Sequence, residues 1–450
     1  MFTQKTLTYL LLLLPLFVQA QPAPEVTFEK KKRFHLPFQQ VNNLILVDLT
    51  INAQPYRFLL DTGVHHTLIF NPKFLDPAQN IKAQETAYLS ISGLGKNEPI
   101  KAFRTVGNTI QIGKMKMEHQ TILWLDEMDA ALGSKMGVSI DGIIGMQFFK
   151  HLRAKIDYRH EYIQIRSLSD KPFRKKGKYY SVPITFFRGK PFVTAKVHLN
   201  DTIAQGSFLL DSGSSDAIWL FENKIGYAAP TPYFKDYLGY GINGDVFGKR
   251  GKVTALDLGF HTFKEPKIAY PDAGAFQNIT MKPDRIGSIG GEILSRFKII
   301  IAYAEQKVYL QPLSHVDAPF YYNMSGIDLQ YDDVKIIATN VPKASSKAMP
   351  QKSYNPNTSS SAELFLDGRK TLKTVNAIAI DKVRPHSPAS HAGIQEGDEL
   401  LRINGRNVVY MNLAEINRLL QRRPGQRIRL LVSRNGQRLY TLSLHDALPI

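Results

Sequence analysis

Two stretches of the chain alternate apolar and polar positions with a period of two. The apolar positions are Ile45, Val47, Leu49 and Ile51 in the first stretch, and Val193, Ala195, Val197 and Leu199 in the second. Successive side chains of a β-strand point to opposite faces, so this period predicts half-buried strands. Hairpin-like segments at 156–165 and 301–310 extend the pattern, and the chain is predicted to be mainly β.

The strand-like stretches belong to an internal repeat. Residues 58–63 read Phe-Leu-Leu-Asp-Thr-Gly and residues 208–213 read Phe-Leu-Leu-Asp-Ser-Gly, which places the two copies 150 positions apart. A second pair of segments follows, Gly-Ile-Ile-Gly at 142–145 and Gly-Ser-Ile-Gly at 287–290. Self-similarity at a fixed spacing indicates a duplicated structural unit.

Each copy carries the same elements in the same order. Strand-like residues precede the aspartate, a glycine-rich turn follows at 92–95 or 239–244, and the apolar-Gly segment and a hairpin come last. Glycine-rich turns between strand-like residues are typical of β-hairpins. The copies extend over about 35–170 and 178–313, which predicts two similar lobes.

The C-terminal part differs from both copies. Residues 340–362 are rich in Ser, Pro, Lys and Asn, which predicts a flexible insertion or linker. The segment 377–444 reads as one compact α/β module, with strands expected near 400–405, 428–432 and 439–444. A helix is predicted after Asn412, whose capping partner would be Glu415. Its expected buried face consists of Leu413, Ile416, Leu419 and Leu420.

Composition excludes several classes of site. The 450 residues include no cysteine, which excludes thiol nucleophiles, disulfides and thiolate metal sites. The 12 histidines show no HExxH spacing, so neither a metal nor a cofactor is predicted. A net charge of +18 raises the question of nucleic acid, but no finger, aromatic RNA-binding motif or phosphate-binding loop accompanies it. We therefore expect no nucleic-acid partner.

The first 20 residues are typical of a secretory signal peptide. Lys5 supplies a positive start, an apolar run follows over 10–18, and Ala20 offers a small residue for cleavage. The apolar run is short for a bilayer span, and no lipid-anchoring cysteine follows it. We expect an exported protein, periplasmic or secreted, without a stable membrane anchor.

The repeated aspartates carry the candidate chemistry. Two carboxyl groups a few ångströms apart cannot both ionise, so such a pair shares one proton. One group can then take a proton from water while its partner donates one to a substrate. A duplication can bring one aspartate from each copy to an axis of approximate twofold symmetry, and Asp61 and Asp211 are the predicted pair.

The paired Asp-Thr/Ser-Gly segments, each followed by an apolar-Gly segment, resemble the aspartic proteases of the retroviral and bilobal pepsin types. The resemblance covers residues 35–313. It implies a mainly β fold in which two pepsin-like β-barrel lobes occupy 21–172 and 173–313, after the signal peptide at 1–20. The likeness is greatest to a bacterial exported family that joins such a protease to a PDZ domain, here expected at 314–445.

The resemblance also implies roles for the residues around the aspartates. Hydroxyls at Thr62 and Ser212 would hydrogen-bond across the pair, while Gly63 and Gly213 would keep the two loops tight. The turn at Gly93 and Gly95 resembles the flap that covers substrate and excludes water. Three features depart from the family pattern: Val64 is bulky, the turn lacks the usual flap tyrosine with only Tyr88 nearby, and two histidines follow Val64. The histidines, His65 and His66, are either surface residues or groups that tune the aspartates or contact substrate.

The C-terminal module resembles the PDZ domains that accompany bacterial proteases. The matching segments are 387–389, 392–394, 397–398 and 403–405. PDZ domains bind a peptide C-terminus as an added strand and hold its carboxylate on backbone N–H groups. The candidate carboxylate loop contains Ser325, Gly326 and Ile327, although this segment could instead merely end the second lobe.

The favoured hypothesis is an aspartic endopeptidase that acts on polypeptide substrates as a monomer, while its PDZ domain binds peptide or protein C-termini. The alternative is a catalytically inactive exported protein that binds peptides on the same scaffold. A serine hydrolase is a third option, but the chain has no Gly-x-Ser-x-Gly elbow and Ser212 is explained by the repeat.

Overall fold

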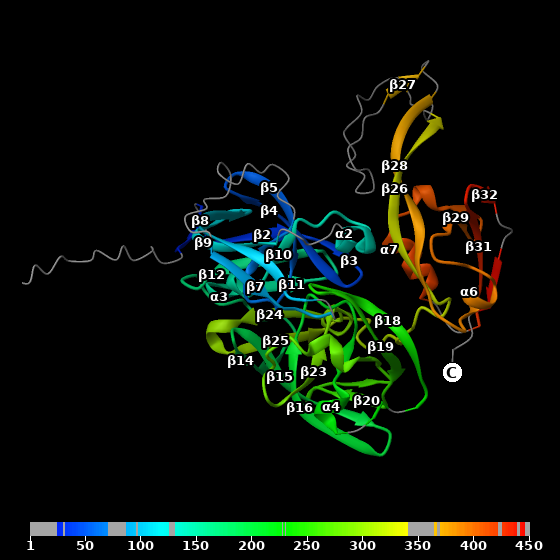
Figure 1. Ribbon diagram of the computed structural model, residues 1–450. Coiled ribbons are helices and arrows are strands. Elements are labelled where there is room, and N and C mark those ends of the chain that lie inside the picture. The colour runs from blue at the N-terminus through cyan, green and yellow to red at the C-terminus, as the bar shows by residue number, and fades with distance from the viewer. Residues whose placement is uncertain are drawn as a thin grey trace, which may run out of the picture.

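The computed structural model describes residues 25–29, 32–70, 87–95, 98–125, 131–226, 228–229, 231–340, 364–366, 370–421, 425–438 and 442–445. The predicted signal peptide lies outside the described residues, as does the predicted linker beyond residue 340. The described chain forms two β lobes and a C-terminal α/β unit beside them, as Figure 1 shows. The mainly β prediction is confirmed. The predicted domain boundaries stay predictions.

The first lobe is built on one mixed sheet. Along the sheet the strands run β1 (Glu25–Phe28), β9 (Met115–Leu125), β6 (Thr67–Ile69), β10 (Gly142–Ile144), β5 (Gln54–Leu60), β4 (Leu44–Ile51), β8 (Ile100–Ile112) and β7 (Ala87–Ile91), with β3 (Gln39–Val41) beside β4. The alternating stretch at 45–51 is therefore a strand. The short helices α2 (Ala131–Met136) and α3 (Met146–Lys150) flank β10 in the chain.

The second lobe repeats this order. Its strands run β18 (Tyr233–Gly241), β19 (Gly244–Lys252), β22 (Lys267–Pro271), β17 (Ile218–Leu220), β23 (Arg285–Ile289), β16 (Thr202–Leu210), β15 (Lys190–Leu199), β20 (Ala255–Asp257) and β21 (Thr262–Lys264), with β14 (Thr185–Phe187) beside β15. In both lobes the strand before the aspartate pairs parallel with the strand of the apolar-Gly segment. Helices α4 (Glu222–Ile225) and α5 (Gly291–Leu294) complete the lobe.

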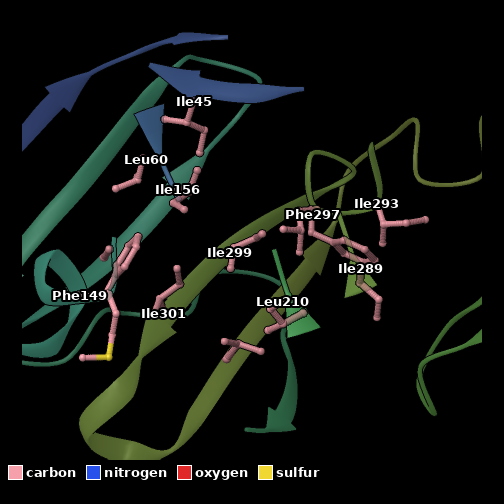
Figure 2. Packing of buried hydrophobic residues seen from close by; sticks show 14 of the residues in the cluster. Ile45, Leu60, Phe149, Ile156, Leu210, Ile289, Ile293, Phe297, Ile299 and Ile301 are labelled. Atoms are coloured by element: carbon pink, nitrogen blue, oxygen red, sulfur yellow. The ribbon is translucent and has the colours of Figure 1, made fainter. Parts of the chain in front are cut away.

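A further sheet belongs to both lobes. Its strands run β13 (Tyr180–Pro183), β25 (Lys307–Pro312), β24 (Phe297–Ala302), β11 (Leu152–Asp157), β12 (Tyr162–Ser167) and β2 (Arg33–Pro37). The lobes meet where β11 pairs antiparallel with β24, which sets Ile156 opposite Ile299. The hydrophobic core is continuous across this junction, as Figure 2 shows for residues of both lobes. Truncating a fully buried side chain there, such as Phe297, is expected to cost about 3–5 kcal/mol.

The C-terminal unit has its own core. Its sheet contains β26 (Ile327–Asn340), β28 (Lys370–Val383), β29 (Glu399–Ile403), β31 (Arg427–Arg434) and β32 (Gln437–Arg438), with β27 (Leu364–Leu366), β30 (Arg406–Asn407) and β33 (Leu442–His445) beside them. The helices are α6 (Pro388–His391) and α7 (Leu413–Leu420). The predicted cap of α7 is confirmed, because Asn412 and Glu415 each hydrogen-bond to the other's backbone N–H.

Candidate active site

Asp61 and Asp211 occupy equivalent places, each directly after the last strand residue before its Thr/Ser-Gly turn. The backbone N–H of Asp61 donates to the carbonyl of Ile144 at 2.9 Å, and that of Asp211 donates to the carbonyl of Ile289 at 2.9 Å. The parallel strands β10 and β23 therefore fix the point at which each chain leaves its sheet. The apolar-Gly segments are next to the aspartate loops in both lobes.

The hydroxyls of Thr62 and Ser212 join the two loops. Thr62 Oγ1 donates to the carbonyl of Leu210 at 2.6 Å and accepts from the N–H of Ser212 at 3.0 Å. Ser212 Oγ donates to the carbonyl of Leu60 at 2.9 Å and accepts from the N–H of Thr62 at 3.0 Å. Both side chains are buried. The reciprocal bonds hold the loops in one geometry, and they leave the Ser212 hydroxyl engaged with backbone.

The carboxyl groups of Asp61 and Asp211 hydrogen-bond to each other. The N–H of Gly63 donates to Asp61 Oδ1 at 2.6 Å, and the N–H of Gly213 donates to Asp211 Oδ1 at 3.2 Å. A Cβ at Gly213 would lie 2.2 Å from Cγ of Asp61, so any side chain there would displace the carboxyl group. The structure thus brings together the predicted pair and its predicted neighbours.

The residues around the pair affect the pKa values of Asp61 and Asp211 differently. Burial raises the pKa of Asp61, and the negative charge of Asp211 raises the pKa of Asp61 further. Burial also raises the pKa of Asp211, but the cations of Arg285 and Lys190 act in the opposite direction. The pair titrates as a unit. Lys190 lowers both pKa values, whereas Arg285 acts on Asp211 and favours the negative charge there.

The carboxyl pair lines a cleft of about 1480 Å³ that both glycine-rich hairpin tips also line. The backbone N–H of Gly93 donates to Asn243 Oδ1, and the N–H of Asn243 donates to the carbonyl of Leu94 at 2.8 Å. Gly95 has φ +127°, and a Cβ there would lie 2.0 Å from the carbonyl oxygen of Asn243. Only glycine fits this contact. The predicted flap therefore meets a second hairpin, β18–β19, from the other lobe.

The role of Asn243 was not predicted, although a signal was present. Gly93 and Asn243 lie 150 positions apart, the same spacing as Asp61 and Asp211. The amide also donates to the carbonyl of Glu98 at 2.7 Å, so one side chain holds both ends of the opposing turn.

The two histidines after Val64 also lie at the cleft. His65 Nδ1 is 3.1 Å from the carbonyl oxygen of Arg188 in the second lobe, and the His65 and His66 rings meet edge to face at 4.6 Å. His66 is exposed. His65 therefore belongs to a contact between lobes, and its influence on the aspartates stays a hypothesis.

The candidate carboxylate loop of the C-terminal unit lies at the start of β26. Ser325 is buried and its Oγ donates to Asn323 Oδ1 at 2.5 Å, while its carbonyl accepts from the N–H of Ala389 at 3.0 Å. Gly326 has φ +81°, and its carbonyl accepts from the N–H of Arg384 at 2.7 Å. Ile327 is the first residue of β26. The loop thus has a fixed shape beside α6.

The start of β26 and the helix α7 face the same cleft as the aspartates. The residues of this unit that line it include Asp328 and Leu329 of β26 and Asn417, Arg418 and Gln421 at α7. Helix α2 of the first lobe contacts β26. There Lys135 pairs with Asp381 at 2.5 Å, and a Cβ at Gly137 would lie 2.5 Å from Cβ of Leu413. Asp381 lies in β28 beside Asp328 and Leu329, so α2 approaches the start of β26, the same part of the strand that lines the cleft.

Comparison with known protein families agrees with this geometry. Residues 47–148 match the aspartyl protease family, and residues 380–434 match the PDZ domain family. The chain contains an aspartyl protease domain and a C-terminal PDZ domain. The protease match lies within the first lobe, and the repeated strand order extends the bilobal architecture to the second. No curated protein matches the chain.

The described ranges also bear on metal binding and on membrane insertion. Those residues contain no group of three or more His, Asp or Glu side chains arranged to hold a metal ion. No helix among them is long and apolar enough to cross a membrane.

Proposed function

We propose that the protein is an aspartic endopeptidase in which Asp61 and Asp211 activate a water molecule. The carboxylate of Asp211 accepts a proton from the water as its oxygen attacks the peptide carbonyl carbon, and the carboxyl group of Asp61 donates its proton to the carbonyl oxygen. Asp211 then donates the proton taken from water to the nitrogen, the C–N bond breaks with its electron pair going to nitrogen, and one hydroxyl of the diol returns a proton to Asp61. The proton and charge distribution within the pair supports these roles.

The observation that carries the proposal is the reciprocal bonding of Thr62 and Ser212 beneath two carboxyl groups that share a hydrogen bond. A pair held in one geometry loses little free energy to reorganisation during the reaction. The closed hairpin tips support a water-excluded cleft, which strengthens the interaction of charges inside it.

The PDZ domain is proposed to bind the C-termini of peptides or proteins and to present them to the cleft. The added-strand mode uses a strand at the edge of a sheet, a neighbouring helix and a shaped loop. The candidates for these parts are β26, the last strand of its sheet, together with α7 and the loop at 325–327, and α2 of the first lobe contacts the same strand. Because Asp328 and Leu329 line the cleft that holds the aspartates, a chain bound on β26 would be delivered near them.

Export, to the periplasm or outside the cell, is proposed from the N-terminal pattern alone. A monomeric state is proposed because one chain supplies both aspartates. Fractionation of cells that express the full chain, and light scattering of the purified protein, test these two points.

The test of catalysis compares Asp61→Asn and Asp211→Asn with the native protein on an unfolded protein substrate. Each variant is expected to lose about 10²- to 10⁴-fold in activity, because an acid–base group contributes about that factor. Asp201→Asn, an exposed aspartate in the turn before β16, is the matched control and should cleave as the native protein does. Equal cleavage by all four proteins would overturn the proposal. Peptide binding without cleavage by the native protein would favour the inactive alternative.

A further inference from the structure

The duplication places equivalent residues around the two carboxyl groups, and strand register identifies them. The strand pair β4–β5 of the first lobe and the strand pair β15–β16 of the second have the same register. Two residues before each aspartate, Leu59 pairs with Leu46 and Leu209 pairs with Phe192. Through this register Leu44 of the first lobe and Lys190 of the second occupy the same position. Equivalent positions need not carry equivalent chemistry, and here a buried leucine corresponds to a lysine.

Two further pairs come from the strands beneath the aspartate loops. Strand β10 lies beside β5 as β23 lies beside β16, with the glycine of each apolar-Gly segment facing a phenylalanine. The residue two before that glycine is Ile140 in one lobe and Arg285 in the other. The residue after it is Ile143 in one lobe and Ser288 in the other. The three exchanges replace apolar residues of the first lobe with cationic and polar residues of the second, where Lys190 acts on both carboxyl groups and Arg285 acts on Asp211.

Arg285 is the strongest feature of this surface. The residue is 9% exposed, its Nη2 donates to Ser288 Oγ at 2.7 Å, and its Nε donates to the carbonyl of Gly287 at 3.2 Å. These bonds fix the guanidinium at the cleft wall. No carboxylate among the described residues forms an ion pair with Arg285 or Lys190, although both cations act on Asp211. The carboxyl pair supplies one shared negative charge against these two cations, so one positive charge has no anion of its own, and burying such a charge is costly.

Several other charges of the cleft are paired with one another. Lys282 is paired with Asp284, and Glu292 with Lys267 at 3.0 Å. Asp216 is paired with Arg250 at 2.7 Å. Lys190 and Arg285 are cations that act on the carboxyl pair itself, which places their capacity for a further anion beside it.

We propose that the subsite formed by Lys190, Arg285 and Ser288 binds a carboxylate of the substrate, and that the equivalent cleft residues of the first lobe, Leu44 and Ile143, bind an apolar side chain. The inference rests on the proposed function, because the two subsites flank the bond that the aspartates would cleave. The carboxylate belongs to an acidic side chain or to the end of a polypeptide. An Arg donor held in place, with a Ser hydroxyl beside it, suits a carboxylate better than a neutral amide.

The test uses the full chain and peptide pairs that differ only as Glu against Gln at each position next to the cleaved bond. The native protein is expected to prefer the Glu peptide at one of these positions by about 10- to 100-fold in kcat/KM, which is the contribution of a hydrogen bond to a charged group. A second pair of peptides has either a free or an amidated C-terminus next to the cleaved bond. If the preference is confined to this pair, the carboxylate that the subsite binds is that of a chain end. A ratio near one in every pair would overturn the inference.

Substitutions tie the preference to the residues. Lys190→Met and Arg285→Met are each expected to bring the Glu-to-Gln ratio of kcat/KM toward one. Arg285→Lys is expected to keep part of the preference for Glu. Lys196→Met, which removes a cation from the exposed face of the same strand, is the matched control and should keep the ratio. Because both peptides of a pair meet the same carboxyl groups, altered protonation of the aspartates cancels in the ratio. If Arg285→Met does not fold, Lys190→Met alone decides, and an unchanged ratio in it would contradict the inference.

The same peptides separate this inference from the proposed function. Versions in which a –CH₂–NH– link replaces the cleavable bond cannot be hydrolysed, and calorimetry measures their binding directly. Preferential binding of the Glu version without cleavage of the ordinary peptide would remove the proposed function and leave the carboxylate subsite standing. Cleavage of Glu and Gln peptides at equal rates would remove the subsite and leave the function standing.

Discussion

Asn243 of the second lobe accepts a hydrogen bond from the backbone N–H of Gly93 in the first, so the tips of two hairpins from different lobes meet at the cleft. The same amide donates to the carbonyl of Glu98. One neutral side chain thus holds two backbone groups of the opposing turn. A substrate that enters between the tips must break these bonds.

Asn243→Ala is expected to make the hairpin tips separate more often. Losing both bonds destabilises the closed contact by about 1–2 kcal/mol, so amide exchange at Gly93 and Gly95 should accelerate by roughly tenfold or more. Gln277→Ala, an exposed amide of the same lobe, serves as the control. Mass-spectrometric hydrogen exchange measures the effect, and unchanged exchange in Asn243→Ala would mean that the tips are held by other contacts.

Lys190→Met is expected to move the pH–rate profile to higher pH. Lys190 favours the negative charge on the carboxyl pair and therefore lowers the pKa values of both aspartates. Removing this cation raises both apparent pKa values of the pair, by about one unit for a charge at close range. Both limbs of a bell-shaped profile should shift in the same direction, whereas Lys196→Met should leave them in place. A shift to lower pH would contradict the assignment.

Asp61→Asn is expected to stabilise the fold near neutral pH. The folded-state pKa of Asp61 is raised above its unfolded value of about 4, so the folded state binds the extra proton and the native protein loses stability as pH rises through that window. The variant has no such proton to lose. Its Tm should therefore exceed that of the native protein at pH 7, and the difference should shrink toward pH 4. A variant less stable than the native protein at pH 7 would show that hydrogen bonds, not charge, dominate at this position.

Asp236→Asn is expected to loosen the PDZ domain from the second lobe. Asp236 pairs with Arg250 of the hairpin strand β19 at 2.8 Å and with Arg384 of the PDZ domain at 2.9 Å, and the Asp236 and Arg384 side chains are 9% and 7% exposed. Removing the shared anion from a buried ion pair costs about 3–5 kcal/mol. Asp48→Asn, which breaks the exposed pair with Arg57, should cost less than about 1 kcal/mol.

Thermal unfolding and small-angle scattering together measure this effect. The Asp236→Asn protein should unfold at lower temperature than Asp48→Asn and show a larger radius of gyration. Equal behaviour of the two variants would mean that the ion pairs at Asp236 do not hold the domains together.

Local and repeated features were predictable from the sequence. The alternating residues at 45–51 and 193–199 set two strands, and the cap formed by Asn412 and Glu415 set a helix start, because each depends on residues close in the chain. The meeting of Asp61 and Asp211 followed from duplication, since equivalent loops approach a common axis.

Features that depend on register or on distant segments were not predictable. Leu44 and Lys190 become comparable only once the strand pairing is known, and Arg285 lies outside the repeated motif. The pair formed by Asp236 and Arg384 joins residues 148 positions apart with no periodic pattern between them. The place of β2 in the sheet to which both lobes contribute likewise depends on its partner strand β12, which is remote in sequence.

The sheet to which both lobes contribute has an evolutionary consequence. Were each lobe a separate polypeptide, one gene would encode both halves of a symmetric dimer, and every substitution would appear twice around the carboxyl pair. A single chain that contains both lobes removes that constraint, because position 44 can be leucine while the equivalent position 190 is lysine. Covalent fusion thus allows the cleft residues of one lobe to change without imposing the same change on the other lobe.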